Sequence, residues 1–203
     1  ATGNEGINVL LHGDGGQSFF AFPNAKAENN LIGVSVLAPN AAMKWGGNGN
    51  DRPDGPAHAK LIADLITNEL PKRMKFDASK VFFTGVSGGS LTLTSAMLPL
   101  FGNQFPSGMF LLCGGLKAAQ DIPANAVNAN TRIHVQTTQN ELASLKATIP
   151  DAITQIQQAF TTAGVNQNQL TVDGAPNGGH CAFDGLGFGS GIQLMLDNFG
   201  KVM

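Results

Sequence analysis

The sequence predicts an α/β protein whose mainly parallel sheet is covered by helices on both faces. Short runs of apolar and β-branched residues, typical of buried strands, recur along the chain. Amphipathic segments of helical length lie between several of these runs, and parallel strands need such crossover connections. At 203 residues, the chain is expected to form one domain over residues 1–203.

The first strand is expected at residues 7–11, where the apolar run INVLL leads into the glycine-rich turn HGDGG. A short helix packed by phenylalanines is expected within residues 19–29. The next apolar run, LIGVSVLA, predicts a second buried strand at residues 31–38.

Residues 39–56 are dense in glycine, proline and asparagine, which predicts a long surface loop. The loop holds Trp45, the single tryptophan of the chain. An aromatic residue in such a loop could contact substrate, and it could equally anchor the loop on the core. A helix follows over residues 54–70, with Asp54 able to cap it and leucines and isoleucines recurring on one face.

The second half of the chain repeats the alternation of strand and helix. Residues 80–84 form a strand, and a helix over residues 90–98 is expected to stop at Pro99. Three further strands are expected at residues 109–112, 132–137 and 170–173. A helix is expected at residues 142–163, with a break at Pro150 and an end at Gly164, and a final helix at residues 192–199.

Between the strand at 80–84 and the following helix lies Gly85-Val86-Ser87-Gly88-Gly89, a G-x-S-x-G sequence. In this context the motif predicts a nucleophile elbow, in which a sharp turn forces the serine backbone toward positive φ. Side chains in place of the flanking glycines would clash with the converging strand and helix. Ser87 would then stand at a helix N-terminus, where unpaired N–H groups stabilise an anion. A glycine-rich turn without chemistry is the alternative.

A serine hydroxyl needs a base within hydrogen-bonding reach to become a nucleophile. His12 belongs to a turn, His58 to a helix start and His134 to the middle of a strand. His180 lies in a glycine-rich loop after the last strand, from which it can reach a serine at the carboxyl edge of the sheet. His180 is therefore predicted to be the general base.

The base in turn needs an acid, which should lie between the serine and the histidine in the chain, at the end of a strand. Glu141 meets this condition, although a helix dipole also favours an acid at the first turn of a helix. Asp121 also follows a strand, at the end of a longer loop, and is the rival.

The turn after the first strand could supply a backbone N–H to the oxygen of a substrate. That amide would belong to Asp14, with Gly15 as the next candidate, and the second donor would be Gly88. The turn fits neither G-x-G-x-x-G nor G-x-x-x-x-G-K-[ST], which argues against a nucleotide-binding loop. A tight connection without a ligand is the alternative.

The three sequences LLHGDGG, GVSGGS and GGHCAF, in this order, resemble the α/β-hydrolase superfamily. Residues 64–90 are similar to secreted esterases of the polyhydroxybutyrate-depolymerase and feruloyl-esterase type. The resemblance implies a minimal α/β-hydrolase fold without a large lid, and ester hydrolysis through an acyl-enzyme with no cofactor or metal. It implies Ser87 as nucleophile, His180 as base, Glu141 as acid, and the amides of Asp14 and Gly88 as the oxyanion hole.

Other activities remain open. Where the family has HG-x-x-D after the penultimate strand, this chain has QTTQNE, which makes the acid a glutamate. A thioesterase or peptidase would use the same residues, and a catalytically silent hydrolase fold could bind a ligand or partner.

Cys113 and Cys181 are the two cysteines of the chain. A disulfide between them would tether the loop of His180, and two buried free thiols are the alternative. Trp45, Phe183 and Phe188 suggest an apolar or aromatic acyl group on the substrate, which is expected to be a small-molecule or polymer-attached ester.

Charged residues make up only 13% of the chain, and the net charge is −2. This balance argues against nucleic acid as a partner, and no apolar run is long enough to span a bilayer. Low charge, together with abundant asparagine, glutamine, serine and threonine, favours a secreted protein. The polar opening ATGNEG does not read as a signal peptide and fits a terminus left by processing.

Overall fold

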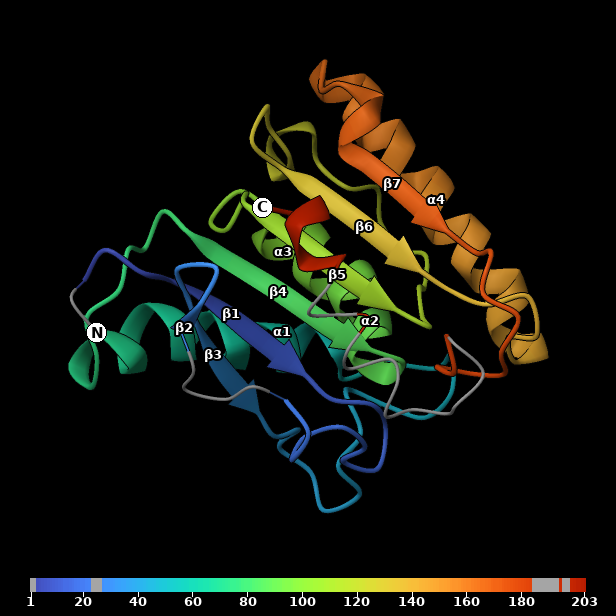
Figure 1. The fold of residues 1–203 in the computed structure, drawn as a ribbon, viewed down its shortest axis with the longest axis horizontal. Helices are drawn as coiled ribbons and strands as arrows, with labels where there is room; N and C mark the ends of the chain where they lie inside the picture. The colour runs from blue at the N-terminus through green and yellow to red at the C-terminus, as the bar shows by residue number, and fades with distance from the viewer. Residues whose placement is uncertain (1–2, 23–26, 184–193, 195–197) are drawn as a thin grey trace.

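The computed structural model describes residues 3–22, 27–183, 194 and 198–203. Its centre is a seven-stranded sheet in the order β2-β3-β1-β4-β5-β6-β7 (Figure 1). All neighbouring strands pair in parallel except β2, which pairs antiparallel with β3. The strands are β1 Gly6–Leu11, β2 Ala27–Glu28, β3 Leu31–Val36, β4 Val81–Val86, β5 Gly108–Leu112, β6 Arg132–Gln136 and β7 Leu170–Asp173.

The predicted α/β class is confirmed, and every predicted strand is present. The central strands β4 and β5 are buried along almost their whole length, as expected for a parallel sheet covered on both faces. β4 is longer than predicted, because Gly85 and Val86 of the serine motif continue it to the sharp turn at Ser87.

Three helical regions pack on one face of the sheet. They share a hydrophobic core with the strands, which includes Leu11, Phe83, Met97 and Phe160. The first region is α1 Gly55–Asp64, continued by η1 Leu65–Glu69 and η2 Leu70–Lys72. The second is α2 Gly88–Thr92, continued by η3 Leu93–Met97 and α3 Leu98–Phe101, and the third is α4 Ala143–Ala163. The short helical turns η4 Ala124–Ala126 and η5 Gln167–Gln169 lie in loops.

Two predictions about prolines are wrong. The helix that was expected to stop at Pro99 continues to Phe101, since Pro99 falls in the first turn of α3, directly after the π-helical η3, where a missing N–H is tolerated. α4 runs without a break through Pro150. Buried side chains on both sides of Pro150, among them Leu145 and Ile156, hold the helix together against a penalty of about 3 kcal/mol for an internal proline.

The helix predicted within residues 19–29 is also wrong in the part that the structure describes. Residues 18–21 form turns that begin at Ser18, whose φ is 72°, and Ala27–Glu28 is strand β2. Phe20 is 96% exposed and does not pack on the core. The final helix predicted at residues 192–199 lies largely outside the described residues.

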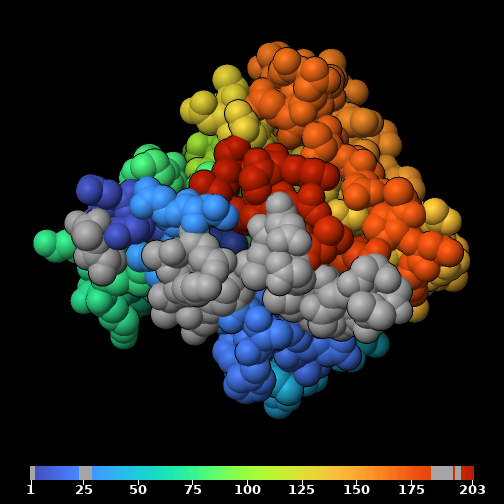
Figure 2. All heavy atoms as spheres, in the orientation of Figure 1, coloured from blue at the N-terminus to red at the C-terminus, as the bar shows by residue number. Residues whose placement is uncertain are grey.

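The opposite face of the sheet carries a second apolar cluster. It joins Phe110 and Leu112 of β5 to Phe183, Phe199 and other residues near the C-terminus. The turn η6 Phe199–Lys201 lies over the sheet in Figure 1, and the space-filling view shows the C-terminal residues, in red, over the middle of this face (Figure 2). Within the described residues, no helix has both the length and the apolar character that a bilayer span requires.

Three histidines are buried in this framework. His134, in the middle of β6, stacks on Phe110 with 5.3 Å between ring centroids, so it is a packed residue. In His12 the ring Nε2 accepts a hydrogen bond from the Ala38 amide, and Nδ1–H donates to the carbonyl of Gly13. This pattern requires the neutral imidazole.

The buried histidines predict a loss of stability in mild acid. Burial lowers the pKa of His12, His58 and His134 below the ordinary value of 6.5. The unfolded chain therefore binds protons first as the pH falls below that value, and the free energy of unfolding drops. Each such histidine contributes up to about 1.4 kcal/mol per pH unit. Urea unfolding between about pH 7.5 and about pH 5.5 measures the slope, which His134→Gln should reduce.

Candidate active site

A pocket of about 270 Å³ opens at the carboxyl ends of the parallel strands. Its lining comes from segments that are distant in the chain: the turn after β1, the end of β4, the start of α4 and the loop after β7. Binding sites of open α/β sheets lie in this position, because the loops that leave neighbouring parallel strands meet there.

Ser87 occupies a strained turn between β4 and α2. Its φ is 48° and its ψ is −112°, a conformation that non-glycine residues rarely adopt. The glycines are needed as predicted, since a Cβ built at Gly85 would lie 2.6 Å from the amide nitrogen of Ser90. A Cβ at Gly89 would lie 2.3 Å from the carbonyl oxygen of Leu11. The close approach of β1, β4 and α2 therefore selects glycine on both sides of the serine.

The loop after β7 brings His180 to this serine. Nε2 of His180 lies 3.0 Å from Oγ of Ser87, and Nδ1 lies 2.5 Å from Oε1 of Glu141. Since a carboxylate can only accept, the contact with Glu141 holds the proton on Nδ1. The lone pair of Nε2 then faces the serine hydroxyl, which is the orientation that a general base requires.

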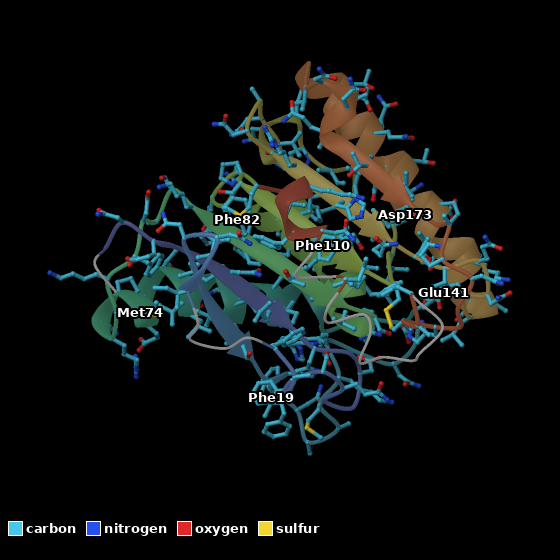
Figure 3. The ribbon with its side chains drawn as sticks, in the orientation of Figure 1. Phe19, Met74, Phe82, Phe110, Glu141 and Asp173 are labelled. Carbon is cyan, nitrogen blue, oxygen red and sulfur yellow. A yellow bond between two sulfur atoms is a disulfide. The ribbon has the colours of Figure 1, made fainter. Side chains whose placement is uncertain are left out.

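Two loops are joined side by side to bring Glu141 and His180 together. The Gln139 amide donates to the carbonyl of Pro176 at 2.9 Å, and Asn140 Nδ2 donates to Oδ1 of Asn177 at 2.8 Å. Glu141 lies near the carboxyl ends of the parallel strands, close to the disulfide (Figure 3). The loop after β6 and the loop after β7 therefore form one unit.

Glu141 is a buried acid, with a side chain only 2% exposed. Its Oε1 also accepts from the Leu142 amide at 2.8 Å, whereas Oε2 has no hydrogen-bond partner among the described residues. The imidazole of His180 is thus the main polar partner of this carboxylate. The rival acid, Asp121, is exposed on a loop and has no contact with His180 in the described residues.

The predicted bridge between Cys113 and Cys181 is present, with a Cα–Cα distance of 5.2 Å. It ties the residue after His180 to the end of β5 across 68 positions of sequence, which by chain entropy contributes about 4 kcal/mol to stability. Among the described residues, one group of three possible metal ligands lies close together, namely these two cysteines and His180. Its two sulfur atoms are bonded to each other.

The HGDGG turn presents its backbone to Ser87. A Cβ built at Gly13 would lie 3.7 Å from Cβ of Ser87. The amides of Asp14 and Gly88 have no acceptor in the described part of the chain, whereas the Gly15 amide donates to the carbonyl of Met43. Gly15, the reserve candidate, is therefore occupied, and the two amides first expected as oxyanion donors remain available.

Trp45 does not line the pocket, which corrects the expectation of a substrate contact. Its side chain is 1% exposed, and its indole N–H donates to the carbonyl of His12 at 2.8 Å. The indole anchors the long loop beneath the HGDGG turn. Phe183 is likewise buried, at 4% exposure, and Phe188 lies outside the described residues.

The pocket also contains residues that the sequence does not single out. Leu91, Leu142 and Leu145 supply apolar wall, and Gln17 and Asn50 supply polar wall. No local pattern marks them, because their positions depend on how distant loops fold together.

Arg52 was missed as well, although it was visible as a single arginine in a loop of glycine, asparagine and proline. Its side chain is 4% exposed and forms an ion pair with Asp14 at 2.7 Å. The signal available in the sequence was Asp14 itself, because a carboxylate within the HGDGG turn needs a cationic partner when it is buried.

No protein-family model matches the sequence, and no curated protein matches it. Solved structures do match. The carboxylesterase of Bacillus cereus aligns with a TM-score of 0.70 and 17% identity over 98% of this chain and 89% of its own. The carboxylesterase of Mesorhizobium loti aligns at 0.69 and 16% over 96% and 88%, and SOBER1 of Arabidopsis thaliana at 0.62 and 19% over 95% and 99%. At these identities the likeness establishes the fold, which is the α/β-hydrolase fold.

Proposed function

We propose that this chain, which has the α/β-hydrolase fold, is a serine esterase that cleaves carboxylic esters through an acyl-enzyme. One observation carries the proposal: Ser87 Oγ lies 3.0 Å from Nε2 of His180, whose Nδ1 contacts Glu141. A hydroxyl, a base and an orienting acid, connected in this order, are what nucleophilic acyl transfer requires.

In the first half-reaction, Ser87 Oγ attacks the ester carbonyl while Nε2 of His180 takes its proton. The carbonyl carbon becomes tetrahedral and its oxygen becomes an anion. His180 then gives the proton to the leaving alcohol, and the C–O bond to that alcohol breaks. Glu141 keeps the proton on Nδ1 and stabilises the imidazolium that forms between these steps.

The anion is stabilised by the backbone N–H groups of Asp14 and Gly88. Both are free of other acceptors within the described residues, and both lie beside Ser87. Donors that are held in position before the reaction need no reorganisation when charge develops, so they lower the barrier. The N-terminus of α2 adds partial positive charge at the same point.

In the second half-reaction, water replaces the alcohol. His180 takes a proton from the water as it attacks the acyl carbon, and then returns a proton to Ser87 Oγ, which leaves as the hydroxyl. The products are the carboxylic acid and the regenerated enzyme. Each step uses the same three side chains and the same two amides.

The pocket supports an apolar acyl group on the substrate. Leu91, Leu142 and Leu145 are among its lining residues, and Leu142 follows Glu141 directly. Asn50 Nδ2 donates to the carbonyl of Ser144 at 3.3 Å, so the long loop and α4 meet across the pocket. A small-molecule ester or an ester group on a polymer fits this site, and the disulfide is compatible with a secreted enzyme.

Labelling with a fluorophosphonate tests the function directly. Folded protein should react at Ser87, because among the described residues it is the serine whose hydroxyl contacts a histidine. It should hydrolyse p-nitrophenyl esters faster than matched thioesters or peptides. Peptide mapping by mass spectrometry identifies the labelled residue. Urea-unfolded protein is the control and should not react. Folded protein that takes up no label and turns over no ester would instead indicate a silent binding protein.

A further inference from the structure

The HGDGG turn carries a carboxylate that ester hydrolysis does not itself require. The side chain of Asp14 lies against Gly88, since a Cβ built at Gly88 would lie only 2.1 Å from its Oδ1. The carboxylate therefore packs directly against the α-carbon of the second oxyanion donor. A negative charge in this position opposes the anion that the two amides are meant to stabilise.

Arg52 neutralises that charge in a two-pronged contact. Its Nη1 donates to Asp14 Oδ1 at 2.9 Å, and its Nη2 donates to Oδ2 at 2.7 Å. Two parallel bonds define both the position and the plane of the carboxylate, which a single ammonium cannot do. Since the side chain of Asp14 is fixed, the direction of its own backbone N–H is fixed as well.

Arg52 is itself held by the loop that contains it. Nε donates to the carbonyl of Gly49 at 2.8 Å, and Nη1 also donates to the carbonyl of Trp45 at 2.8 Å. The indole of Trp45 in turn donates to the carbonyl of His12, next to the turn. The guanidinium and the indole thus both bind the loop to the turn. The Gly15 amide, which donates to the carbonyl of Met43, and the Trp45 backbone amide, which donates to Asp14 Oδ1 at 3.5 Å, join the same two segments.

From this geometry we propose that Arg52 is a positioning residue of the oxyanion hole, acting through Asp14. The inference rests on the proposed function and deepens it. Arg52 fixes the Asp14 amide and cancels the charge beside Gly88, so its effect should appear in the transition state and not in substrate binding. Four of the five N–H groups of its guanidinium donate within the chain, so Arg52 is assigned to hold Asp14 in place.

The test is a double-mutant cycle on Arg52→Gln and Asp14→Ala. Arg52→Gln should lower kcat by about 10- to 100-fold, with KM changed by less than about threefold, because the amides are misaligned and the nearby charge is no longer cancelled. Binding of an alkyl boronic acid, which forms a tetrahedral anion on Ser87, should weaken by a similar factor. The double variant should be no worse than the more damaged single variant, since both act through one contact.

Arg73→Gln is the matched control, since Arg73 also pairs with a carboxylate, that of Glu69 at 3.0 Å, but on the exposed surface. It should leave kcat unchanged. If Arg52→Gln does not fold, Arg52→Lys and Asp14→Asn probe the same contact from both ends, because each keeps a polar group but breaks the two-pronged geometry. Both should reduce kcat and weaken boronic acid binding together.

The inference is overturned if the effects of the two substitutions multiply, or if KM rises while boronic acid affinity stays constant. It is equally overturned if Arg52→Lys and Asp14→Asn fold normally and keep full kcat. A wild-type protein that shows no Ser87-dependent ester turnover would remove the proposed function instead. The two failures are therefore distinguishable.

Discussion

Replacing Ser87 with alanine is expected to lower kcat/KM for p-nitrophenyl esters by about 10⁴- to 10⁶-fold. The substitution removes the atom that forms the acyl-enzyme, and among the described pocket residues no other hydroxyl has a hydrogen bond to a histidine. Residual turnover would come from the two amides and His180 acting on water. Initial rates across a range of ester concentrations measure the change.

Folding is not expected to suffer, because alanine lacks only the hydroxyl. Ser95→Ala is the matched control, since Ser95 lies in η3 of the same helical region, is half-buried and does not line the pocket. Its variant should keep full activity. Ester turnover that survives in Ser87→Ala would contradict the proposed function at its centre.

Glu141→Gln is expected to lower kcat by about 10³- to 10⁴-fold at neutral pH. Glutamine has nearly the same shape, but its amide group can donate to Nδ1 of His180. The imidazole would then hold its proton on Nε2, facing Ser87, and could not act as a base. The imidazolium would also lose its only anionic partner among the described residues, the carboxylate at 2.5 Å.

Asp121→Asn is the control for this prediction, because Asp121 was the rival acid in the sequence. It is exposed on its loop, and its variant should retain full kcat. Steady-state kinetics on both variants, with thermal unfolding to verify the fold, make the comparison. The reverse result, an inactive Asp121→Asn and an active Glu141→Gln, would reassign the acid.

Local sequence was a reliable guide where conformation is set by neighbouring residues. The elbow at Ser87 is of this kind, because a positive φ between a strand and a helix demands small flanking residues, and Gly85 and Gly89 meet that demand within five positions. The buried strands were predictable for a similar reason, since a short apolar run of strand length between two turns is typical of a buried strand.

Proline-based boundaries were less reliable, and the reason is energetic. Pro150 costs a helix one hydrogen bond, but α4 buries apolar side chains on both sides of it, and this burial outweighs the loss. A prediction based on neighbouring residues includes the cost of the proline but not the tertiary contacts that compensate for it. The same holds for Trp45, whose role depended on whether its indole found a partner beneath the turn.

Residue order and local spacing were enough to indicate the strands, the strained serine and the histidine loop, since each follows from steric and hydrophobic preferences over a few adjacent positions. The contact between Glu141 and His180, the burial of Trp45 and the pairing of Arg52 with Asp14 are visible only in the folded chain. These depend on contacts between residues 33 to 39 positions apart, namely Trp45 with His12, Arg52 with Asp14 and His180 with Glu141. Such contacts are selected by the packing of whole loops against one another, and no short stretch of sequence contains that information.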